Sequence, residues 1–143
     1  VSAIGSYHIG LRGTTTRRGV YDHTRELGYS MITMRDFMRR GHDDIITELH
    51  EKISGRPVYL SWDMDVFDPS CAPGVCTPAW GGFLAREGIE IIRDLAGLNI
   101  VGADVNTVSP PHDLAGMTSF LAASITYEIL LLIWRFRQIK GLK

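Results

Sequence analysis

An apolar run that ends in three closely spaced aspartates is the feature that most constrains this chain. The run reads Val58-Tyr59-Leu60-Ser61-Trp62-Asp63-Met64-Asp65-Val66-Phe67-Asp68-Pro69. Its apolar half predicts a buried β-strand, and strand side chains repeat every two residues, so Asp63 and Asp65 are expected to point to the same side. Two carboxylates held that close repel each other unless a cation lies between or beside them. The run therefore predicts a divalent metal bound by hard oxygen ligands.

Three other interpretations of this run are a solvated turn, a calcium loop and a phosphohydrolase motif. The three aspartates could simply cap and solvate the turn after a strand, and Asp68, which precedes Pro69, is expected to cap the turn or to orient a metal ligand from behind. A calcium loop of the EF-hand type is excluded, because its twelfth position requires Glu and here holds Gly74. A phosphohydrolase of the haloacid dehalogenase type also begins with a strand and an Asp-x-Asp pair. It is the weaker enzyme alternative, because Phe67 stands where that family has Thr or Val.

The remaining pattern predicts the fold class. Four apolar, β-prone runs are Tyr7 to Leu11, Tyr29 to Thr33, Val58 to Ser61 and Ile100 to Val105. Helical spacing of apolar residues follows or separates them in 45–53, 88–95 and 121–132. Strands that alternate with helices predict an α/β fold with a mostly parallel sheet covered on both faces. We expect one domain over residues 1–143, and the apolar strand at its beginning predicts an edge that pairs with a further part of the same domain.

Charge and composition limit the kinds of partner that the sequence predicts. A net charge of -1, from 15 basic and 16 acidic residues, predicts no nucleic acid or acidic membrane as partner. The apolar stretch from Phe120 to Phe136 contains Glu128 and predicts a buried helix rather than a membrane span. Cys71 and Cys76 form neither a disulfide framework nor a zinc motif, which favours reduced thiols and a cytoplasmic protein.

Several segments, in order along the chain, resemble the ureohydrolases, the superfamily of arginases and agmatinases. The run from Ser61 to Pro69 resembles their Ser-x-Asp-x-Asp-x-x-Asp-Pro signature, with Trp62 where Phe is common. The other segments similar to this family are His8 to Gly13, Ala72 to Pro78, Gly81-Gly82, Arg86 to Gly88, Val101 to Asn106 and Ser109 to Asp113. Because the match follows the order of the family along nearly the whole chain, it is more specific than any single motif.

The resemblance implies a three-layer α/β/α fold, of which this chain is the C-terminal portion. It implies two divalent metal ions, Mn²⁺ or Ni²⁺, that activate water to split the C–N bond of a guanidino compound into urea and an amine or ammonia. Asp63 and Asp65 correspond to catalytic metal ligands. The family's other His and Asp ligands come from Gly-Gly-Asp-His and Asp-Ala-His-x-Asp signatures upstream, so a preceding segment of the same protein is expected to complete the centre. A homo-oligomer, trimer or hexamer, is expected as well.

The resemblance also bears on the substrate, because Thr107 stands where arginases and agmatinases place Glu facing the guanidinium. With Trp80, Asn106 and His112 nearby as substrate-binding candidates, the pattern resembles guanidine hydrolases, which act on free guanidine or a small alkylguanidine. Three of them have a structural alternative: Thr107 could fill the end of a strand, Trp80 could be a core aromatic residue, and His112 could be a solvent-exposed loop residue. Agmatinase is the alternative activity, and a non-catalytic subunit of the same fold is the alternative of another class.

Overall fold

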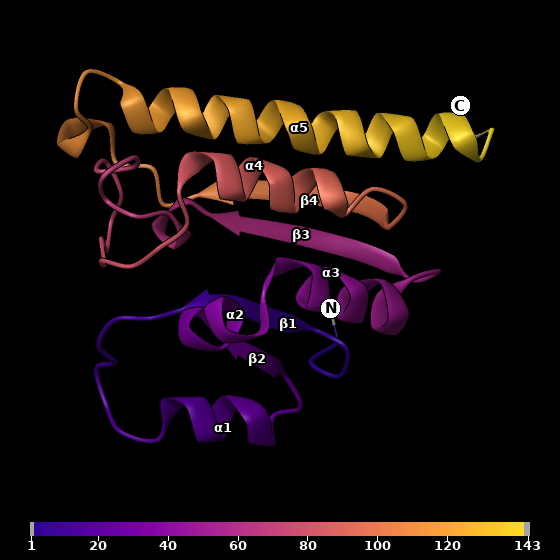
Figure 1. Ribbon diagram of the computed structural model, residues 1–143, viewed down its shortest axis with the longest axis horizontal. Helices are drawn as coiled ribbons and strands as arrows, with labels where there is room; N and C mark the ends of the chain where they lie inside the picture. The colour runs from indigo at the N-terminus through magenta and orange to yellow at the C-terminus, as the bar shows by residue number, and fades with distance from the viewer. Residues whose placement is uncertain (1, 142–143) are drawn as a thin grey trace.

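The computed structural model describes residues 2–141 and shows strands and helices in alternation (Figure 1). In chain order the elements are β1 (Tyr7–Leu11), α1 (Val20–Glu26), β2 (Ser30–Thr33), α2 (Met34–Arg40), α3 (His42–Ile53), β3 (Pro57–Asp63), the 3-10 helix η1 (Met64–Val66), α4 (Ala85–Asp94), β4 (Asn99–Asn106), the 3-10 helix η2 (Pro110–His112) and α5 (Met117–Ile139). The four predicted strands and the three predicted helices are confirmed. The short helices α1 and α2 and the two 3-10 helices were not predicted.

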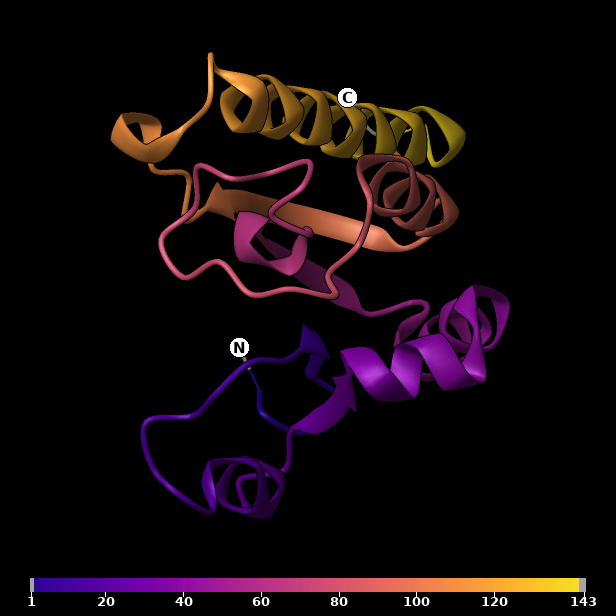
Figure 2. The ribbon, with the colours of Figure 1, turned by 60° about the vertical axis from the view of Figure 1, so that its left-hand side comes forward.

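The strands form two separate pairs rather than one sheet. β1 pairs with β2 and β3 pairs with β4, both in parallel. Within the described residues β1 and β3 share no hydrogen bonds, so the expectation of one continuous sheet is wrong for this part of the chain. An open groove of about 850 Å³ separates the two pairs, lined mainly by apolar side chains of β1 and β3 and reaching Asp63 at one end. Figure 2 shows the two pairs as distinct bodies of the fold.

Helices pack on the strand pairs, as expected for layered α/β structure. α4 and α5 lie together on β3 and β4 (Figure 1), and α2 packs on β1 and β2. The α4 stripe predicted from helical spacing buries Ile91 and Ile92, and the helix is followed by Gly97 in a left-handed conformation that ends it. Leu84 precedes α4 without a hydroxyl, but Glu87 accepts a hydrogen bond from its amide at 2.7 Å. The arginase-like α/β class with parallel strands is confirmed.

The last helix is buried on one face only. Its inward stripe packs on β4 and α4 and consists of Leu121, Ile125, Ile129 and Leu132. Its outward face exposes Phe120, Tyr127, Leu130 and Trp134. The expectation of a buried helix is therefore wrong for this outer face. Among residues 2–141, α5 is the helix long and apolar enough to cross a membrane, a property that the core helix of a soluble protein shares.

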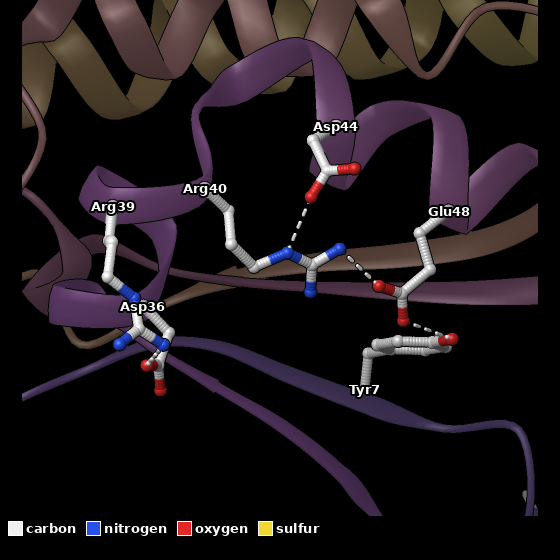
Figure 3. Close-up of polar contacts among 6 residues, drawn as sticks. All are labelled: Tyr7, Asp36, Arg39, Arg40, Asp44 and Glu48. Atoms are coloured by element: carbon white, nitrogen blue, oxygen red, sulfur yellow. Dashed lines mark hydrogen bonds and ion pairs between the residues drawn. The ribbon is translucent and has the colours of Figure 1, made fainter.

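A polar network connects the first strand to the helices beside it (Figure 3). The Tyr7 hydroxyl donates to Glu48 at 3.0 Å, and Arg40 donates to Glu48 at 2.5 Å and to Asp44 at 2.6 Å. Desolvation raises the pKa of Tyr7, and the Glu48 carboxylate raises it further. These bonds connect the start of β1 to α2 and α3.

Candidate metal centre

The candidate site lies where β3 ends. Asp63 is the last residue of β3, and Asp65 lies in the one-turn helix η1 that follows. The strand repeat therefore does not set the direction of Asp65, and that part of the sequence argument is wrong. The turn itself brings the two residues together, because Asp63 Oδ1 accepts a hydrogen bond from the Asp65 amide at 2.8 Å.

Two threonines orient the two carboxylates. The Thr107 hydroxyl donates to Asp63 Oδ1 and accepts a 3.3 Å hydrogen bond from the Asp65 amide. The Thr77 amide donates to Asp65 Oδ1 at 3.2 Å, and the Thr77 hydroxyl donates to Asp65 Oδ2. Hydrogen bonds to a carboxylate restrict its rotamer. The orientation of each carboxylate is thus fixed by a threonine.

The backbone at Thr107 is strained in a way that serves this contact. Thr107 follows directly on β4, where Asn106 is the register partner of Asp63, and it has a φ of 63°. A β-branched residue in the left-handed region costs on the order of 1–3 kcal/mol. This conformation places the hydroxyl on Asp63 and leaves the Thr107 carbonyl to accept from the Cys76 amide at 3.1 Å.

The donor set fits part of a metal site. Two carboxylates at the carboxyl end of a parallel strand suit a hard divalent cation, and Asp63 Oδ2 accepts no hydrogen bond from residues 2–141. Within the same residues, however, no group of three or more His, Cys, Asp or Glu side chains converges. Asp63 and Asp65 as metal ligands therefore stay a prediction, and the two carboxylates alone would make an incomplete coordination sphere.

Asp68 supports the loop rather than the carboxylate pair. Its Oδ1 accepts from the Ser70 amide at 3.0 Å and its Oδ2 accepts from the Gly81 amide at 2.8 Å. Hydrogen bonds from Ser70 and Gly81 lower the pKa of Asp68 to about 2. Asp68 thus caps its own turn, as expected, and ties it to the segment that carries Trp80.

The substrate-binding candidates lie in different surroundings. Trp80 is 79% exposed in the loop beside Gly81. The Asn106 amide donates to Asp104 at 2.6 Å and to Ser61 at 3.1 Å, and a His112 ring nitrogen lies 2.7 Å from the Ser109 hydroxyl. Of the four candidates, the hydrogen bonds bring Thr107 to the carboxylate pair and engage Asn106 and His112 elsewhere. Substrate contact by these residues stays a prediction.

Sequence reasoning missed two residues of this site. Thr77 and Arg12 lie in the family-like segments Ala72 to Pro78 and His8 to Gly13, but nothing in those segments marks either residue as part of a site. Arg12 Nη2 donates to the carbonyl of Asp65 at 2.6 Å across 53 positions of sequence. Neither side chain carries a spacing signal, because both act through contacts that only the folded chain creates.

Comparison with known proteins places this site in a family. Residues 2–132 match the model of the arginase family. The chain is 38% identical over 122 residues to the human mitochondrial guanidino acid hydrolase and 42% identical over 122 residues to proclavaminate amidinohydrolase of Streptomyces clavuligerus. Each match covers 85% of this chain, but 35% of the human protein and 39% of the Streptomyces protein.

Solved structures agree with this match. The structure of the Streptomyces clavuligerus amidino hydrolase aligns with a TM-score of 0.86 at 38% identity, covering 95% of this chain and 44% of that one. The arginase of Bacillus caldovelox aligns with a TM-score of 0.78 at 32% identity, covering 86% of this chain and 42% of that one. The chain thus spans less than half the length of these relatives. By sequence and by fold, it belongs to the arginase family.

Proposed function

We propose that this chain is the C-terminal part of a binuclear-metal hydrolase that cleaves the C–N bond of a guanidino compound, releasing urea and an amine or ammonia. The observation that carries the proposal is the pair of carboxylates at the end of β3, each fixed by a threonine hydroxyl. Family membership supports the reaction class, because relatives that match this chain are named guanidino acid hydrolase, guanidinobutyrase and agmatinase.

The residues of this chain have separable tasks in that reaction. Asp63 and Asp65 would hold the metals, which supply an activated water and stabilise negative charge when bound. Thr107 and Thr77 hold the two carboxylates in a fixed orientation, so they need not reorganise when the guanidino carbon is attacked. Asp68 fixes the loop beside them through Ser70 and Gly81.

The remaining ligands are proposed to come from a segment of the same protein outside these 143 residues. Two ligands are too few for a metal centre, and relatives that match are more than twice as long as the matched region. Within residues 2–141, the groove between β1 and β3 reaches Asp63, and the two strand edges that face it have no hydrogen-bonded partner strand. A strand edge in that state is a template for a further segment.

The proposed substrate is free guanidine or a small alkylguanidine. Thr107 offers a hydroxyl already engaged by Asp63, so it supplies no negative charge for a guanidinium. The exposed Trp80 ring is a planar surface on which a small guanidinium can stack. Agmatine, which bears a second cation, is the alternative substrate.

A guanidino acid is a second candidate on a specific observation. Arg17 and Arg18 are exposed in the loop after β1. That loop begins at the carboxyl end of β1, the same side on which β3 ends (Figure 1). Arginine side chains there would complement the carboxylate of a guanidino acid. A relative named guanidinobutyrase, from Pseudomonas aeruginosa, is 38% identical over 122 residues.

Cellular setting and assembly are proposed in the same way. Cys71 and Cys76 are free thiols in the structure, which is the state that a reducing cytoplasm maintains. A homo-oligomer is proposed because α5 leaves Phe120, Tyr127 and Trp134 exposed on one face, more apolar surface than a solvated helix needs.

A comparison of substrates with the full-length protein tests the proposal. We would measure kcat/KM for guanidine, methylguanidine, agmatine and guanidinobutyrate in the wild type and in Thr107→Glu. The wild type is expected to prefer guanidine, and Thr107→Glu is expected to lower the rate on guanidine while leaving agmatine equal or improved, because the added charge favours a cation and the bulk shrinks the pocket.

Other outcomes would redirect the assignment. A wild type that prefers agmatine, with an unchanged ratio in Thr107→Glu, contradicts the small-guanidine proposal. A wild type that prefers guanidinobutyrate supports the guanidino acid. Absence of hydrolysis with all four compounds in metal-loaded protein would instead favour the non-catalytic subunit.

A further inference from the structure

The Arg12 side chain joins the end of β1 to two other stretches of backbone at the candidate centre. Arg12, directly after β1, donates from Nη2 to the carbonyl oxygens of Asp65 at 2.6 Å, Phe67 at 2.8 Å and Ala79 at 2.8 Å. Its Nε also donates to the Ala79 carbonyl at 3.2 Å. These carbonyls belong to the turn after β3 and to the loop that continues into Trp80.

The position of these carbonyls explains why a guanidinium is used. The carbonyls of Asp65 and Phe67 lie at and just beyond the end of η1, where a short helix leaves carbonyl groups without partners inside the helix. A cation suits that end of a helix, and only arginine spreads five N–H donors over a planar fork. Nη2 shares its two N–H groups among the three carbonyls, and Nε adds a second donor to Ala79. A lysine ammonium at this position would lie one bond nearer the main chain and would have no counterpart of Nε.

Arg12 lies near three aspartates but forms its hydrogen bonds with main-chain carbonyls. The side chain is partly buried, and desolvation lowers its pKa, while the charges of Asp68, Asp65 and Asp63 counteract that effect. The guanidinium thus lies close enough to sense all three aspartates. Its hydrogen bonds nevertheless go to main-chain carbonyls, and the carboxylates of Asp63 and Asp65 remain bonded to the threonines.

We infer that Arg12 is a positioning residue of the metal centre, which fixes the main chain of Asp65 and of the Ala79 loop so that the Asp65 carboxylate meets the metal. The inference rests on the proposed function, because it assigns a role toward the proposed metals. Thr77 holds the side chain of Asp65 and Arg12 holds its main chain. The end of β1 is thereby coupled to Asp65, a proposed ligand in the turn after β3.

Metal titration of the full-length protein tests the inference without relying on activity. Mn²⁺ affinity would be measured by competition with a chelator in the wild type, Arg12→Lys and Arg12→Gln. Both variants are expected to bind Mn²⁺ about 10-fold to 100-fold more weakly, the range typical of residues that orient a ligand. Arg35→Lys, at an exposed position of α2, is the matched control and is expected to bind like the wild type.

The two variants separate geometry from charge and from folding. Arg12→Lys keeps the charge and loses the fork, so wild-type affinity in this variant would overturn the inference. Thermal unfolding without metal reports folding. A variant that unfolds at a lower temperature but binds Mn²⁺ like the wild type would reduce Arg12 to a structural role and also overturn it. If one variant does not fold, the other decides by the same criterion. A wild type that binds no divalent metal would instead refute the proposed function itself, so the two failures are distinguishable.

Discussion

Replacing Thr107 by Val isolates the contribution of one hydroxyl to the candidate centre. Valine has nearly the same shape and is β-branched as well, so the strained backbone at a φ of 63° is retained. The change removes the hydroxyl that donates to Asp63 Oδ1 and that accepts from the Asp65 amide. The Asp65 amide keeps its other hydrogen bond, to Asp63 Oδ1.

The magnitude follows from the kind of hydrogen bond that is lost. A hydrogen bond to a charged group contributes about 1.5–3 kcal/mol. Asp63 is exposed, so water replaces part of the bond and the lower end of that range applies. A loss of about 1.4 kcal/mol corresponds to about a tenfold weaker metal affinity.

Isothermal titration of full-length protein with Mn²⁺ would measure this change, with Thr47→Val, at an exposed position of α3, as the control. We expect about tenfold weaker binding in Thr107→Val and no change in Thr47→Val. Metal-free stability should fall by no more than about 1.5 kcal/mol, the lower end of the same range, because the lost bond lies at the surface. Unchanged Mn²⁺ affinity in Thr107→Val would refute the argument that this hydroxyl orients Asp63.

Two further predictions concern the scaffold of the full-length protein. In Gly82→Ala the new Cβ would lie 2.5 Å from the Asp68 amide and from the main chain of Val66 and Phe67. Urea unfolding should therefore show a free energy of unfolding that is lower by about 1–3 kcal/mol. In the control Gly102→Ala the new Cβ meets the Tyr59 ring at 3.3 Å, so the loss of stability should be smaller. Asp113 accepts hydrogen bonds from the amides of Thr118 and Ser119 at the start of α5; desolvation raises the pKa of Asp113, but these bonds outweigh it and hold the pKa well below its ordinary 3.8. The stability that the Asp113 carboxylate contributes is therefore present above about pH 4 and is lost as the pH falls through and below that value. The difference in stability between wild type and Asp113→Asn should be largest near neutral pH and should shrink in acid. A difference that stays constant with pH would contradict this linkage.

The strands and the position of Asp63 were predictable because their signals are local. The apolar run that begins at Val58 predicts β3, and the carboxyl end of that strand predicts the place of Asp63. The position of Asp65 was predicted for the wrong reason, because whether a strand continues or turns at Met64 depends on Thr77 and Thr107. Such contacts join residues 12 and 44 positions apart in sequence and leave no periodic signal.

Other features escaped prediction for the same physical reason. Helix α1 buries no residue, so it has no apolar stripe that a sequence pattern could reveal. The separation of β1 from β3 depends on which edges find partners, and single strands do not specify their neighbours. The exposed face of α5 looked like a buried helix because apolar composition alone does not say which surfaces are covered.

Metal analysis of the full-length protein tests the central claim most directly. We would measure bound Mn²⁺ and Ni²⁺ per subunit, and guanidine hydrolysis, in the wild type, Asp63→Asn and Asp65→Asn. The wild type is expected to bind two divalent ions, and each variant is expected to lose metal and nearly all activity, because a neutral amide is a much weaker ligand for a hard cation. Full metal occupancy with ordinary turnover in both variants would contradict the assignment of Asp63 and Asp65 as the metal ligands of this chain.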